Sequence, residues 1–181
     1  MQTTMMTAES EQTDDPDDSI KRPHAADGAC VHDLIAACPP LDQNSLYANL
    51  LQCSDFSQTC AIVKTHDRAD AWVSGYIPPD QPDVYFLWQV AVRETARGRK
   101  LPQRMLTEIF ARPICKDVRY LKTTITPDNK ASWALFERVA KTLNAPLNSA
   151  PHFDKDVHFK GNHESEILVT IGPFVRPGSD S

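Results

Sequence analysis

The segment WQVAVRETARGRKLPQRML, residues 88–106, decides the fold. It reads as the end of an apolar strand, a short basic loop and the start of a helix. The first turn of a helix offers unpaired backbone N–H groups and a partial positive charge, which together favour a bound anion such as a pyrophosphate. Arg97, Arg99 and Lys100 add formal positive charge at this junction. The segment therefore predicts a phosphate-binding loop between a strand and a helix.

Helices and strands alternate on both sides of this segment. The clearest strand is VYFLWQVAV, residues 84–92, whose nearly continuous apolar run is typical of a strand buried on both faces. Asp42 or Asn44 is expected to cap the second helix, and Asp128 or Asn129 the last. The order of elements predicts an α/β or α+β protein, with a sheet and helices packed on it. Helices are expected over 31–38, 45–53, 101–112 and 130–143, and strands over 59–66, 71–77, 84–92, 120–126 and 166–174, with a further short strand near 152–158.

The chain has 181 residues, of which 41% are hydrophobic, so it can bury the core of one domain. Residues 1–28 are polar and acidic and are expected to be disordered. Residues 29–175 are expected to form a single domain, and residues 176–181 a flexible tail. The net charge is -5, and six acidic residues lie within residues 1–20; without them, 19 basic residues face 18 acidic ones.

These patterns exclude several classes of protein. The body of the chain lacks the basic excess of a nucleic-acid binder, so no nucleic-acid partner is expected. No apolar run approaches the roughly 18 residues of a membrane-spanning helix, and no basic segment followed by an apolar one suggests a secretory signal. The five cysteines are odd in number and form no CxxC pair, which indicates reduced thiols in the cytoplasm. The spacing of Cys and His fits no common zinc template, so no metal is expected.

Strand, basic loop and helix are followed by a second strand, Asn129 and an aromatic-bearing helix, an arrangement that resembles the acetyl-CoA site of the GCN5-related N-acetyltransferases (GNAT). The resemblance implies a central mixed, mostly antiparallel sheet with a splayed strand, flanked by helices. It also implies that acetyl-CoA is a co-substrate, with its pantetheine arm on the splayed strand and its pyrophosphate at the loop. The implied cofactor-binding residues are Val90, Ala91, Val92, Arg97, Gly98, Arg99, Lys100, Leu101, Asn129, Trp133 and Phe136.

Five motifs narrow the resemblance to the diaminobutyrate acetyltransferase subfamily. They are CPPLDQNSLY at 38–47, VSGYIPPDQPD at 73–83, LWQVAV at 87–92, TPDNKASWALFERVA at 126–140 and IGPF at 171–174. This subfamily catalyses the first dedicated step in the synthesis of ectoine, an osmoprotectant. The resemblance implies direct transfer of acetyl from acetyl-CoA to the γ-amine of L-2,4-diaminobutyrate, which gives N-γ-acetyl-diaminobutyrate. It also implies a homodimer.

The substrate has two ammonium groups, and the resemblance assigns Asp42 and Glu164 as the carboxylates that bind them. Trp88 is expected to wall the pocket or to contact an ammonium group face-on. Asn129 is expected to bind the substrate or the pantetheine amide, and Asp42, Tyr47 and Glu164 are the catalytic candidates. Each residue also has a simpler reading: Asp42 and Asn129 as helix caps, Tyr47 and Trp88 as core aromatics, and Glu164 as a solvated loop acid.

The thioester oxygen must also be polarised, and a backbone N–H freed by a strand bulge at Val90 to Val92 is the candidate. Members of the superfamily often use a Tyr as the general acid, on the helix that corresponds to the one after Asn129 here. This chain has Phe136 at that position. Phe cannot donate a proton. Either Tyr47 supplies it, or the CoA thiolate leaves unprotonated.

The loop departs from the superfamily pattern Q/R-x-x-G-x-G/A. Arg97 fits the first position, but Lys100 and Pro102 stand where glycine and glycine or alanine are expected. Glycine permits unusual φ angles and a close approach of the backbone, and proline removes one N–H donor. Weaker binding of acetyl-CoA is therefore expected. Two alternatives follow: an acetyltransferase for another small diamine or amino acid, and a non-catalytic acyl-CoA-binding scaffold of the same fold.

Overall fold

The structure is a computed structural model that describes residues 19–176. Its sheet has six strands in the order β1-β2-β3-β4-β6-β5, and every neighbouring pair is antiparallel except β3 and β4. The strands are β1 (Ala61–Thr65), β2 (Arg68–Tyr76), β3 (Val84–Val92), β4 (Tyr120–Ile125), β5 (Leu147–Phe153) and β6 (Glu166–Ile171). The helices are α1 (Gly28–Ala36), α2 (Leu46–Ser54), α3 (Leu101–Ala111) and α4 (Lys130–Thr142), with 3-10 turns η1 (Ala25–Asp27), η2 (Ser57–Thr59), η3 (Glu94–Ala96) and η4 (Pro113–Cys115).

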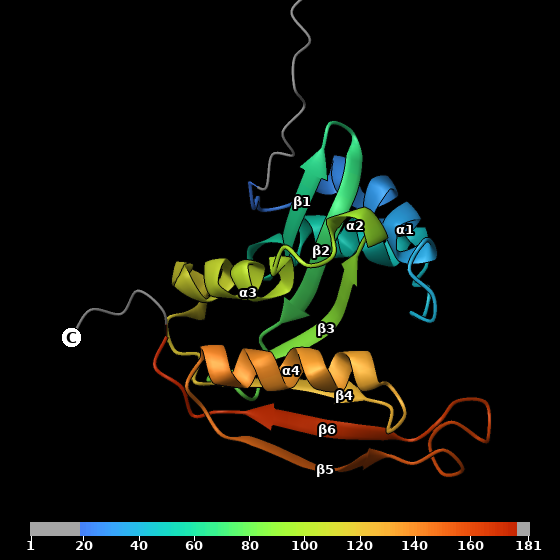
Figure 1. The fold of residues 1–181 in the computed structure, drawn as a ribbon, viewed down its shortest axis with the longest axis vertical. Helices are drawn as coiled ribbons and strands as arrows, with labels where there is room; N and C mark the ends of the chain where they lie inside the picture. The colour runs from blue at the N-terminus through green and yellow to red at the C-terminus, as the bar shows by residue number, and fades with distance from the viewer. Residues whose placement is uncertain (1–18, 177–181) are drawn as a thin grey trace, which may run out of the picture.

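The helices cover the sheet in two groups (Figure 1). Helices α1 and α2 lie on one side of the β1–β3 part and α3 on the other, while α4 runs along β4 and β6. One apolar cluster joins buried residues of α3 and α4 to the sheet, and a second joins α1, Cys53 of α2 and Trp72 of β2. The predicted mixed, mostly antiparallel sheet flanked by helices is confirmed.

Strands β3 and β4 are paired at one end only. Their parallel pairing runs from Val84–Tyr120 to Phe86–Lys122, and the rest of β3, up to Val92, extends past it. The sheet therefore opens between these two strands, which provides the expected splayed strand.

Strand β3 is covered on both faces, as predicted, except at Trp88, the one exposed residue of the strand. Its pairing with β2 passes from Ser74–Gln89 to Gly75–Leu87, so Trp88 is an extra, bulged residue. Trp88 is 48% exposed and lies in the part of β3 that extends past its pairing with β4. The bulge that was expected at Val90 to Val92 therefore lies two residues earlier.

The boundaries of the domain also differ from the prediction. Residues 1–18 and 177–181, expected to be disordered and flexible, lie outside the described residues. Residues 19–28 do not fit the expectation of disorder, because Lys21 exchanges two backbone hydrogen bonds of 2.9 Å with Ile62 at the edge of the sheet. Arg176 donates to the Ala111 carbonyl at 3.2 Å. The short strand expected near 152–158 lies earlier, as β5 (Leu147–Phe153).

Asp27 ties the ordered residues 19–28 to the sheet through an ion pair with Lys64, and this pair is expected to stabilise the fold. Its carboxylate is buried and lies 2.7 Å from Lys64 Nζ. Burial raises the pKa of Asp27, but the hydrogen bonds from Lys64 and from the His24 backbone N–H outweigh burial and hold it below the ordinary value. Replacing Asp27 with Asn is expected to lower the free energy of unfolding by about 2 kcal/mol, because the buried ion pair is broken.

Urea denaturation at several pH values tests this prediction. A lowered pKa in the folded state stabilises the protein above the unfolded-state pKa, and this stability is lost as the pH falls through the folded-state pKa. The difference between wild type and Asp27→Asn is therefore expected to be full at pH 7 and to shrink below about pH 4. The exposed Asp55 serves as control, since Asp55→Asn is expected to change little. A difference that stays constant with pH would contradict the ion-pair explanation.

Candidate active site

The loop between β3 and α3 has the geometry of an anion-binding turn. Arg97, Gly98 and Lys100 are exposed, and Gly98 and Lys100 adopt left-handed backbone with φ of +83° and +56°. Lys100 is the residue before the first turn of α3 and stands where the superfamily has glycine. Lys100 therefore adopts the left-handed conformation of this turn, although a residue with a side chain disfavours that conformation relative to glycine. Pro102 lies in the first turn of α3, where its missing N–H breaks no helical hydrogen bond.

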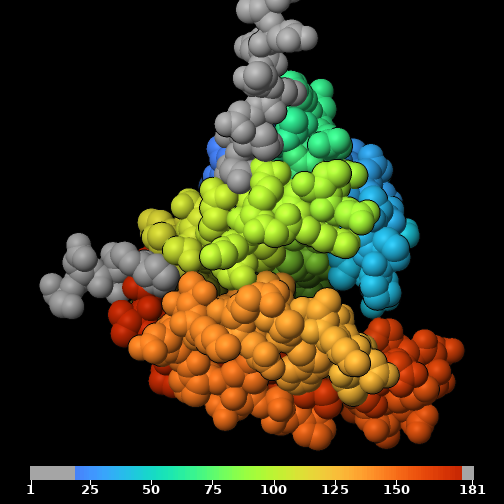
Figure 2. Space-filling model, viewed as in Figure 1, coloured from blue at the N-terminus to red at the C-terminus, as the bar shows by residue number. Residues whose placement is uncertain are grey.

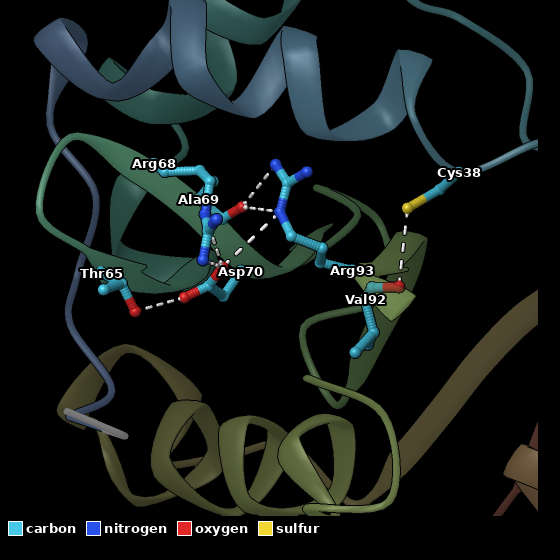
Figure 3. A network of polar contacts seen from close by, with 7 residues as sticks. All are labelled: Cys38, Thr65, Arg68, Ala69, Asp70, Val92 and Arg93. Atoms are coloured by element: carbon cyan, nitrogen blue, oxygen red, sulfur yellow. Dashed lines mark hydrogen bonds and ion pairs between the residues drawn. The ribbon is translucent and has the colours of Figure 1, made fainter. Parts of the chain in front are cut away.

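A partly buried network around Asp70 fixes the strand end from which this loop departs (Figure 3). Asp70 is an extra residue where β1 pairs with β2, and its carboxylate accepts hydrogen bonds from Thr65 at 2.5 Å and from Arg68 at 3.1 Å. Arg93 donates two bonds to the Ala69 carbonyl at 3.1 and 3.2 Å, and its backbone N–H donates to the Asp70 carbonyl at 2.9 Å. The first residue after β3 is therefore clamped to β2, which fixes where the basic loop begins.

The end of β3, where acetyl-CoA is expected to bind, offers mainly its backbone. Ala91 is buried, while Val90 and Val92 are partly buried beside the opening of the sheet. Leu101 is also buried, so any contact of Ala91 or Leu101 with acetyl-CoA would use main-chain atoms. On α4, Asn129 accepts a hydrogen bond from the Ser132 N–H at 3.0 Å, which confirms its reading as the helix cap.

Two aromatic residues of α4 were expected to contact the cofactor, and they differ in position. Trp133 is partly exposed and donates from Nε1 to the Thr126 carbonyl at 3.3 Å. Phe136 is buried in the main apolar cluster, so it has little surface left for a ligand. Figure 2 shows a furrow between the surface of α3 with its preceding loop and the surface of α4. Trp133 is the better placed of the two for contact with a bound molecule.

The loop between α1 and α2 carries Asp42. The cap of α2 is Ser45, whose Oγ accepts from the Ala48 N–H at 3.1 Å, so the prediction of Asp42 or Asn44 as the cap is wrong. The side chain of Asp42 is 83% exposed, and its Oδ2 lies 3.4 Å from His163 Nε2 in the β5–β6 loop. The structure thus brings together two loops that are far apart in the sequence.

His163 lies between two carboxylates. Its Nδ1 is 2.7 Å from the Glu164 carbonyl oxygen, which can only accept, so this nitrogen carries the proton. Nε2 then faces Asp42 at 3.4 Å and Glu166 at 3.9 Å. The hydrogen bond to the Glu164 carbonyl raises the pKa of His163, and the two carboxylates raise it further. The ring thus lies between the two acids and links the Asp42 loop to the start of β6.

Glu166, at the first position of β6, is the acid that the sequence analysis missed. Its side chain is only 16% exposed, and its Oε2 is buried without a hydrogen-bond partner. Burial raises its pKa, which Thr124 and His163 offset only in part. A buried oxygen of a carboxylate favours a partner such as an ammonium group. The available signal was the position of Glu166 at the start of an apolar strand, whereas Glu164 lies in the preceding loop.

The other residues expected in the substrate site, Glu164, Tyr47 and Trp88, differ in their contacts and in their exposure. Glu164 is exposed and pairs with Lys155 at 2.7 Å, which lowers the pKa of Glu164. Tyr47 lies on the exposed side of α2. Trp88 is braced by Tyr76, with ring centroids 6.2 Å apart and the rings nearly perpendicular, and it leaves half of its surface open.

Comparisons with known proteins identify the family of the chain. Residues 29–140 match the acetyltransferase (GNAT) family. The chain is 54% identical over 156 residues to the L-2,4-diaminobutyric acid acetyltransferase of Methylotuvimicrobium alcaliphilum, covering 86% of this chain and 91% of the relative. It is 49% identical over 156 residues to that of Chromohalobacter salexigens, covering 86% and 81%. The chain belongs to the L-2,4-diaminobutyric acid acetyltransferase family.

A solved member of this family supports the same assignment. Diaminobutyrate acetyltransferase EctA from Paenibacillus lautus, in complex with L-2,4-diaminobutyric acid and coenzyme A, is 34% identical with a TM-score of 0.81, covering 87% of this chain and 95% of the other. The predicted family, the GNAT fold and acetyl-CoA-dependent acyl transfer are confirmed. Within residues 19–176, no helix is long and apolar enough to cross a membrane, and no group of three or more His, Cys, Asp or Glu is placed to hold a metal ion.

Proposed function

We propose that this acetyltransferase transfers the acetyl group of acetyl-CoA to the γ-amine of L-2,4-diaminobutyrate, at the opening between β3 and the start of β6. The observation that carries the proposal is the cluster of Asp42, His163 and Glu166, two acids around one histidine. This cluster suits a substrate with two ammonium groups. The Paenibacillus lautus relative, which holds the diamino acid and coenzyme A, supports the choice of substrate.

The reaction requires a neutral amine. If the γ-ammonium has a lysine-like pKa of about 10.4, deprotonation at pH 7 costs roughly 4–5 kcal/mol. Glu166, whose pKa burial raises, is the best candidate to receive that proton, directly or through a water molecule. The freed nitrogen attacks the thioester carbonyl and forms the C–N bond, the C–S bond breaks, and CoA leaves as the thiolate. The nitrogen gives up its second proton to solvent, which leaves the neutral amide. Asp42 is assigned to the other ammonium group, and Trp88 to the wall of the pocket.

The residues on the cofactor side have simpler roles. Arg97 and Lys100 are assigned to the pyrophosphate, together with the backbone N–H groups of the α3 start. The open edge of β3 beyond Phe86 is assigned to the pantetheine arm, because its backbone is not paired with β4 there. An N–H beside the Trp88 bulge is the donor proposed for the thioester oxygen.

The proposal extends to two properties of the whole protein. All five cysteines, which lie within the described residues, are free, and this supports a cytoplasmic location. The resemblance to the subfamily supports a homodimer, for which sedimentation analysis is the direct measurement.

Turnover is the decisive test. Purified protein with acetyl-CoA and L-2,4-diaminobutyrate is expected to release free thiol and to give a product acetylated at the γ-nitrogen by NMR, with lysine and ornithine as poor substrates. Preference for another amine would favour the first alternative. Binding of acetyl-CoA by calorimetry, without turnover of any amine, would favour the non-catalytic scaffold.

A further inference from the structure

Gln89 links the cofactor strand to the loop that carries Asp42. Its side-chain Nε2 donates to the Asp42 carbonyl at 2.8 Å, and its Oε1 accepts from Asn44 Nδ2 at 2.9 Å. Gln89 is 8% exposed, while Asp42 and Asn44 lie nearer the surface, so both bonds are partly buried. One buried amide therefore holds two positions of the α1–α2 loop.

The Trp88 bulge explains why Gln89 points toward this loop. Leu87 belongs to the apolar cluster of α3, while Ala91 belongs to that of α1. In a regular strand, residues four apart share a face, so the extra residue has moved the later part of β3 to the opposite face. Gln89, two residues before Ala91, thus faces the side of α1 and α2. The bulge therefore turns Gln89 to the face that carries the Asp42 loop, where Trp88 already lies.

The position of the Asp42 carboxylate is set mainly by the backbone of the α1–α2 loop, because the side chain itself has few contacts. The side chain is largely exposed, and its contact with His163 is long, at 3.4 Å. The loop is anchored more firmly than the side chain: Cys38 Sγ donates to the Val92 carbonyl at 3.5 Å, and Ser45 caps α2. Between these two ends, the amide of Gln89 fixes the residues on either side of Gln43.

We propose that Gln89 is a positioning residue for the diamino acid site, which fixes the Asp42 loop so that the carboxylate faces His163 and the substrate. This inference rests on the proposed function, because it assigns Asp42 to a substrate ammonium group. Gln89 acts through Asp42 and does not itself contact the substrate. It also ties the two binding sites together, since its backbone is part of the cofactor strand.

The inference predicts a selective kinetic defect. Gln89→Leu keeps the size of the side chain and removes both hydrogen bonds. It is expected to raise KM for L-2,4-diaminobutyrate about 10-fold, which corresponds to about 1.4 kcal/mol, and to change KM for acetyl-CoA less than about twofold. Gln89→Glu keeps the acceptor for Asn44 but places an oxygen against the Asp42 carbonyl, so it is expected to be no better than Leu.

A double-mutant cycle separates positioning from general damage. In an Asp42→Asn background the carboxylate is already gone, so adding Gln89→Leu is expected to change KM for the diamino acid less than about twofold. Gln52→Leu is the matched control, because Gln52 is another buried amide and accepts from Asn49 Nδ2 at 3.0 Å on α2. It is expected to lower the melting temperature and leave both KM values unchanged.

Equal effects of Gln89→Leu in the two backgrounds, or a wild-type KM in the single variant, would overturn the positioning role. Hydrogen exchange gives a readout that does not need turnover: the amides of residues 41–44 are expected to exchange faster in Gln89→Leu than in Gln52→Leu. Equal exchange in the two variants would also overturn the inference. A wild-type protein without turnover of the diamino acid would instead contradict the proposed function, and the exchange comparison would still decide whether Gln89 fixes the loop.

Discussion

Replacing Glu166 with Gln is expected to lower kcat/KM for L-2,4-diaminobutyrate by about 100-fold. The variant loses a largely buried carboxylate that is proposed to bind the γ-ammonium and to accept its proton. Loss of a buried charge–charge hydrogen bond costs roughly 3 kcal/mol, and 1.4 kcal/mol is a factor of ten. KM for acetyl-CoA is expected to stay near the wild-type value.

Glu164→Gln is the matched control, since it makes the same chemical change two residues away. Glu164 is 65% exposed and paired with Lys155, so the variant is expected to keep kcat/KM within about threefold of wild type. The reverse result, a large defect in Glu164→Gln and a small one in Glu166→Gln, would restore the assignment made from the sequence. Circular dichroism of both variants excludes unfolding as the cause.

The pH profile gives an independent check. Burial raises the pKa of Glu166, so the carboxylate is protonated as the pH falls through a value above that of an ordinary glutamate. If activity depends on this carboxylate, kcat/KM is expected to fall as the pH is lowered and to recover as the pH is raised. This acid limb is expected to be absent in Glu166→Gln and unchanged in Glu164→Gln.

The sequence predicted the fold well because its signals are local. The apolar run of β3, the basic loop and the amphipathic helices each follow from residues that are close in the chain. The site was predicted less well, because Asp42, His163 and Glu166 meet only after the sheet has formed. The Trp88 bulge shows the same limit: an apolar run reveals a strand, but which face each residue takes depends on how the neighbouring strand pairs with it.

The second large effect is expected in the phosphate loop. The double variant Arg97→Ala/Lys100→Ala is expected to raise KM for acetyl-CoA about 30-fold, with a small change in KM for the diamino acid. Each exposed cation is expected to contribute about 1 kcal/mol to a phosphate contact, a factor of about five. Raising the ionic strength is expected to weaken acetyl-CoA binding more in wild type than in the double variant, because salt screens the two lost charges. Lys116→Ala, on the surface beyond η4, is the control and is expected to change neither KM.

Lys100 also allows charge and backbone to be separated. Lys100→Ala and Lys100→Gly remove the same charge, but only glycine relieves the left-handed φ of +56°. Both are expected to raise KM for acetyl-CoA about fivefold, and the glycine variant is expected to be more stable than the alanine variant by up to about 1 kcal/mol. If glycine instead restored the wild-type KM, the backbone would bind the phosphate and the charge of Lys100 would be dispensable. Equal KM values for the two variants, above that of wild type, would mean that the lysine charge supplies the affinity that glycine provides elsewhere in the superfamily.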